Sequence, residues 1–66
     1  MPNLITTANL DDPDGTFEAL MEAHRDLDPE TSRRLDAALV LLLANHIGQT
    51  DIIRQAIALA GNASKA

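Results

Sequence analysis

The chain contains no cysteine, no tryptophan and no tyrosine, and Phe17 is its only aromatic residue. Without thiols the protein can form neither disulfide bonds nor thiolate metal sites, and a cysteine nucleophile is excluded. A single aromatic ring cannot provide a repeated stacking platform for nucleic-acid bases. His24 and His46 are therefore the only nitrogen ligands that a metal could use.

Basic residues are scarce as well, with five Lys and Arg against ten Asp and Glu and a net charge of −5. Residues 11–30 hold eight acidic side chains and one basic side chain, Arg25, which gives this segment a net charge of −7. Nucleic acid and anionic membranes are bound by clustered Lys and Arg, so we expect neither partner. We interpret the acidic segment as a solvated helix face that complements helix dipoles, in preference to a cation site.

The N-terminal residues lack both a basic cluster and an apolar run. We therefore expect no secretory signal and a cytoplasmic location. Residues 1–11 show no helical period, and we interpret them as an extended arm. Its apolar side chains, Leu4, Ile5 and Leu10, can lie across a helical surface, and simple fraying is the alternative.

The most apolar stretch runs from Leu35 to Gly48 and includes eight consecutive apolar residues, 37–44. At 100° per residue its side chains surround a helix almost completely, so this helix must be covered on more than one side. The run is much shorter than the roughly 20 apolar residues that span a bilayer. Small chains without disulfides or metals commonly depend on oligomerisation, and we expect the same of these 66 residues.

The helix boundaries are marked by capping patterns. Asp12-Pro13-Asp14 and Asp28-Pro29-Glu30 each combine an N-cap, a proline at the first position and an acidic first turn. They predict one helix that ends near Leu27 and a second that ends at Ile47, before a left-handed Gly48. A third helix is expected from Gln49 or Thr50 to Gly61. The result is a single helical domain over 12–61, between the arm of 1–11 and a frayed tail of 62–66.

The predicted fold class is all-α. Because the break between the first two helices is short, we expect an antiparallel helical hairpin, completed by a short third helix. The apolar central helix predicts that two copies pack as a dimeric helical bundle. The residues expected at this interface are Leu35, Leu39, Leu41, Leu42, Leu43, Asn45, His46 and His24.

Three polar side chains interrupt these apolar stripes: His24, Asn45 and His46. In an antiparallel hairpin the two histidines would lie ~20 Å apart along the axis, so one chain cannot use both on one ligand. We expect each histidine to be satisfied by a carbonyl or a carboxylate, although symmetry mates of one histidine can meet at an interface. Asn45 either sets the register of a helix pair or binds carbonyls at the helix end.

The sequence does not support a calcium loop, a DNA-binding motif or a catalytic site. Asp12-Pro13-Asp14-Gly15 resembles part of a calcium loop, but with Gly15 at the sixth position the first and twelfth are Leu10 and Met21, which are not ligands. A DNA-binding helix-turn-helix lacks its basic recognition helix. The chain holds no combination of nucleophile, base and oxyanion site, so we expect no enzyme, no catalytic residue and no cofactor.

The segment Leu39–Gly48, together with Asn9-Leu10, Asp12, Asp14 and Ala23-His24, resembles DUF2783, a family of small bacterial proteins of unknown function. The resemblance covers about residues 5–60. It implies a short, cytoplasmic, helical protein without an established activity, and it brings no catalytic residues. It also implies an accessory role beside flavin-dependent aromatic-ring hydroxylases and other catabolic enzymes.

Two hypotheses about function follow. The first is an interaction protein that forms a homodimer through the apolar central helix and serves as an accessory or regulatory partner of a larger, flavin-dependent catabolic enzyme. The alternative is a small-ligand or metal-binding protein in which His24 or His46, with Asn45, lines a pocket at the subunit junction.

Overall fold

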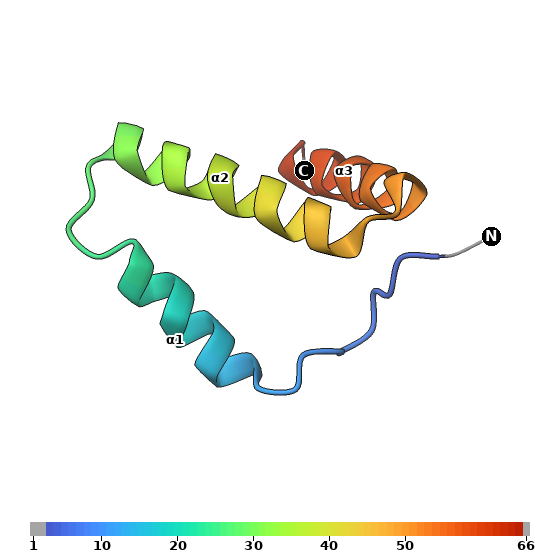
Figure 1. Ribbon diagram of the computed structural model, residues 1–66, viewed down its shortest axis with the longest axis horizontal. Coiled ribbons are helices and arrows are strands. Elements are labelled where there is room, and N and C mark those ends of the chain that lie inside the picture. Colours follow the sequence, from blue (N-terminus) through green and yellow to red (C-terminus); the bar gives the residue numbers. More distant parts are fainter. Residues whose placement is uncertain (1–2, 66) are drawn as a thin grey trace.

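The computed structural model describes residues 3–65, which form three helices and no strand. The helices are α1 (Pro13–Ala23), α2 (Pro29–Ile47) and α3 (Thr50–Ser64), as Figure 1 shows. The all-α class is therefore confirmed. Met1, Pro2 and Ala66, which the sequence assigned to the arm and the tail, lie outside the described residues.

The helix starts follow the predicted capping chemistry. The Asp12 carboxylate accepts the N–H of Gly15 at 3.0 Å, and Asp28 accepts the N–H of Thr31 at 2.8 Å. Hydrogen bonds from the Thr31 side chain and backbone hold the pKa of Asp28 below its usual value. At the other end of α2, Gly48 adopts the left-handed conformation with φ 72° and donates to the Ala44 carbonyl. These local predictions are confirmed.

Two other helix ends differ from the prediction. α1 ends at Ala23 instead of Leu27, because the chain turns through Asp26, whose φ is 60°. α3 continues through Gly61 to Ser64, so it is longer than α1 and includes residues expected to fray. The alanine residues around Gly61 favour the helix strongly enough to offset the low helix propensity of one glycine. The Ser64 hydroxyl also donates to the Ala60 carbonyl at 2.9 Å.

α1 and α2 form an open V rather than a packed hairpin (Figure 1). Within residues 3–65, only α2 and α3 bring their backbones close together. The prediction that the first two helices pack against each other in one chain is therefore wrong. A short connection determines which helix ends meet, whereas the angle between two helices depends on side chains that fill the space between them.

The N-terminal arm returns toward the corner between α2 and α3 (Figure 1). The Leu4 N–H donates to Oε1 of Gln55 on α3 at 3.0 Å, and Leu4 is half-buried. Ile5 and Leu10 remain exposed. The arm thus lies across a helical surface through Leu4, as one of the two interpretations of this segment expected.

The chain encloses no core of its own. No residue in the described range is buried, and the solvent-accessible surface is 5873 Å². A compact folded chain of 7.1 kDa is expected to expose only ~4,100 Å². The radius of gyration is 13.5 Å, compared with ~11 Å for a compact chain of this length. The helices are therefore formed, but most of their apolar surface still faces solvent.

Candidate functional site

An apolar groove of about 510 Å³ occupies the V between α1 and α2. On the α2 side, Leu35 and Leu39 are half-buried and Leu43 is more exposed. On the α1 side, small residues prevail, and only two polar residues reach the groove. The lining residues are Thr16, Ala19, Leu20, Ala23, His24, Leu35, Leu39 and Leu43. We call this the α1–α2 groove.

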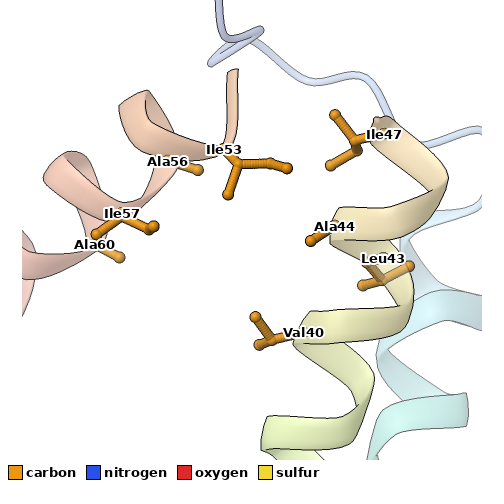
Figure 2. A pocket seen from close by; sticks show the side chains of 8 residues that line it. All are labelled: Val40, Leu43, Ala44, Ile47, Ile53, Ala56, Ile57 and Ala60. Carbon is orange, nitrogen blue, oxygen red and sulfur yellow. The ribbon is translucent and has the colours of Figure 1, made fainter. Parts of the chain in front are cut away.

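A second apolar groove, of about 290 Å³, lies between α2 and α3. Figure 2 shows its side chains projecting from the two helices toward an open space between them. All are apolar: Val40, Leu43, Ala44, Ile47, Ile53, Ala56, Ile57 and Ala60. We call this the α2–α3 groove. Because Leu43 lines both grooves, they meet at one position on α2 and together form a continuous apolar surface.

The two largest side chains of α1 line neither groove. Phe17 is 64% exposed and Met21 is 60% exposed, although both belong to the apolar stripe of α1. Leu20 lines the α1–α2 groove. At 100° per residue, Phe17 and Met21 lie ~60° and ~100° around the helix from Leu20. The apolar stripe of α1 is therefore divided, with its bulky part turned away from the chain's own α2.

His24 connects α1 to α2. Its Nδ1 lies 2.6 Å from the Leu20 carbonyl oxygen, and its Nε2 lies 2.6 Å from Oδ1 of Asp36 on α2. The Leu20 carbonyl, followed by Asp36, raises the pKa of His24 above its ordinary value of 6.5. Both partners accept hydrogen bonds, so the doubly protonated, cationic ring fits this position at the end of α1. The expectation that a carbonyl or a carboxylate satisfies His24 is confirmed.

The contact between His24 and Asp36 is expected to weaken at alkaline pH. Folding raises the pKa of His24. The contribution of protonated His24 to the stability of the folded chain is therefore complete below pH 6.5, and it is lost as pH rises through the raised pKa. An NMR titration of the imidazole Cε1–H in a His46→Gln background, which leaves a single histidine, measures this pKa. Adding Asp36→Asn should lower the pKa of His24, and a pKa at or below 6.5 in the His46→Gln chain that retains Asp36 would contradict this expectation.

The structure brings together only part of the predicted interface. Leu35, Leu39, Leu43 and His24 meet in the α1–α2 groove. Leu41 and Leu42 are 71% and 69% exposed and line neither groove.

Asn45 and His46 are exposed in the last turns of α2 and do not line the grooves that Leu43 joins. The apolar side of α3, which lines the α2–α3 groove, was not among the residues predicted for the interface. The signal for it was present in the i, i+3, i+4, i+7 spacing of Ile53, Ala56, Ile57 and Ala60.

Apart from His24, no charged side chain within residues 3–65 lines either groove. Arg25, in the turn after α1, pairs with Glu22 at 2.6 Å, and Arg34 pairs with Glu30 within α2 at 2.9 Å; both pairs are well exposed. Such surface pairs contribute little stability. In the part of the chain that the structure describes, no group of three or more His, Asp and Glu could hold a metal ion. No described helix is long and apolar enough to span a membrane.

Comparison with known proteins identifies one family. Residues 4–62 match a family described as a protein of unknown function, DUF2783. The match covers α1, α2, most of α3 and most of the arm. No solved structure matches the chain.

Proposed function

Because the chain belongs to the DUF2783 family, whose description assigns no function, we propose a role from its geometry. The protein is a helical interaction module whose fold is completed by a second copy of the same chain. The observation that carries this proposal is the absence of any buried residue over positions 3–65, in a chain whose three helices are fully formed. Helices of this length are marginal in water unless an apolar face is covered.

The amount of excess surface supports a permanent dimer. One chain exposes 5873 Å², which is ~1,800 Å² more than a compact chain of its mass. If two chains each cover that excess, the interface buries ~3,600 Å², within the range of obligate homodimers. The radius of gyration of 13.5 Å is also close to the ~14 Å of a compact assembly twice as long.

The character of the surface supports the same conclusion. The two grooves that meet at Leu43 are lined almost entirely by aliphatic side chains. Obligate interfaces resemble a domain core cut in half, whereas transient ones are more polar. This surface therefore suits a permanent partner better than an occasional one.

That such a dimer acts as an accessory or regulatory partner of a larger, flavin-dependent catabolic enzyme stays a prediction. The acidic side chains of α1 are exposed, and Glu18 is available to a basic surface of that enzyme. A stoichiometric enzyme retained with the tagged protein from its native organism would establish this role.

The alternative, a ligand or metal site formed by His24 or His46 with Asn45, has less support. Both ring nitrogens of His24 already have partners in Leu20 and Asp36. Asn45 and His46 line neither groove. A site built on them would need residues of a second chain, so dimer formation comes first in either case.

Size-exclusion chromatography with light scattering, combined with helicity measured on dilution, tests the proposed function. We expect twice the chain mass of 7.1 kDa and a helical signal that falls on dilution, because unfolding is coupled to dissociation. The midpoint of thermal unfolding should likewise rise with concentration. A 7.1 kDa species with cooperative, concentration-independent unfolding would refute the proposal.

A further inference from the structure

We propose that α1 of each copy packs its Phe17 and Met21 side into the α1–α2 groove of the other copy. The contact is reciprocal about a two-fold axis, as in other isologous dimers. It rests on the proposed function, because it specifies which surfaces of the two copies meet. The result is a four-helix bundle made of two α1 and two α2 helices, with α3 beside α2.

The shapes of the two surfaces are complementary. The α1–α2 groove is about 510 Å³ in volume, and its α1 wall carries the small residues Ala19 and Ala23. The bulky residues of α1, Phe17 and Met21, are 64% and 60% exposed and line neither groove. Large side chains that enter a site walled by small ones allow helices to interdigitate at core density. The side chains of Phe17 and Met21 thus have the volume needed to fill the α1–α2 groove of the other copy.

The chain cannot fill this groove with its own Phe17 and Met21. Leu20 and His24 already occupy the side of α1 that faces α2, and His24 holds this orientation through its 2.6 Å contact with Asp36. Turning α1 by the ~100° that would direct Met21 into the groove would break this contact. The bulky side chains that fill the groove must therefore come from another molecule.

The charged side of α1 is compatible with this arrangement. Glu18 and Glu22 each lie ~160° around the helix from Leu20, which faces the groove, again by the 100° rule. With the groove side against its own α2 and the Phe17 side against the partner, each α1 keeps these carboxylates exposed to solvent. No unpaired charge is buried, which a stable apolar interface requires.

Disulfide trapping tests the contact directly, because the natural chain has no cysteine. A Met21→Cys chain and an isotopically labelled Leu39→Cys chain are mixed, unfolded, refolded together and oxidised. The mass then separates the mixed disulfide from the two homodimers. Leu41→Cys, on the same helix but lining neither groove, is the matched control. We expect about tenfold more mixed disulfide with Leu39→Cys than with Leu41→Cys, because the bond needs close Cβ atoms.

The outcomes separate this inference from the proposed function. A dimer by light scattering in which Leu41→Cys traps better than Leu39→Cys would overturn the α1 contact and leave the dimer in place. A monomer would remove both. Isotope-filtered NMR on a mixture of labelled and unlabelled wild-type chains gives an answer that needs no variant to fold. Contacts between chains from the Phe17 ring to the Leu39 methyl groups support the inference, and their absence in a dimer refutes it.

Discussion

Replacing Leu43 by glutamate is expected to convert the dimer into a largely unfolded monomer. Leu43 lines both grooves, so on pairing its side chain would be surrounded by aliphatic groups from three helices. A carboxylate there would be desolvated without a partner, at a cost of several kcal/mol. A loss of ~3 kcal/mol weakens association by about 100-fold. Sedimentation equilibrium measures the dissociation constant, and circular dichroism measures the loss of helix that accompanies it.

Leu41→Glu is the matched control for this experiment. Leu41 is on the same helix, is 71% exposed and lines neither groove. The same charge change should alter stability by no more than ~0.5 kcal/mol, as at other surface sites. If Leu41→Glu dissociated the dimer while Leu43→Glu left it intact, the interface would lie on the other side of α2.

The success of the sequence predictions depended on the range of the interactions involved. Asp12, Asp28 and Gly48 were assigned correctly because a cap is a contact within one helical turn. The prediction of an antiparallel packing of α1 and α2 was wrong, because no local sequence signal determines the angle between two helices. Asp36, which contacts His24 across the V, lies twelve residues away in sequence, and nothing in its spacing identified it as a partner.

The predicted interface was only partly brought together for a related reason. A helix that is apolar nearly all round has no polar side to show which leucines face which neighbour. Leu35, Leu39 and Leu43 share one groove, whereas Leu41 and Leu42 lie outside both. The division of α1 into a small side and a bulky side was equally hidden, because Leu20 and Phe17 belong to the same stripe in sequence. Only the position of α2 relative to α1 shows that Leu20 faces the groove and Phe17 does not.

The two glycines that follow or interrupt helices are expected to respond with opposite signs. Gly48→Val should lower the free energy of unfolding by ~1–2 kcal/mol, because an L-residue in the left-handed region meets its own carbonyl. Here φ is +72°. Gly61→Ala should raise it by ~0.5–1 kcal/mol, because Gly61 is inside α3 and an added Cβ would meet nothing within 4 Å apart from its chain neighbours and its own helix backbone. Urea unfolding at one fixed chain concentration measures both.

Gly48 also sets the corner between α2 and α3, so its substitution should affect association as well as stability. The α2–α3 groove is bounded by Ile47 just before this corner and Ile53 just after it. A change in the corner moves these walls relative to each other and disturbs the surface that the second copy covers. Gly48→Asn, which tolerates the left-handed conformation, should retain most of the dimer affinity that Gly48→Val loses. Equal losses for Asn and Val would show that the side chain at this corner, rather than backbone strain, determines the effect.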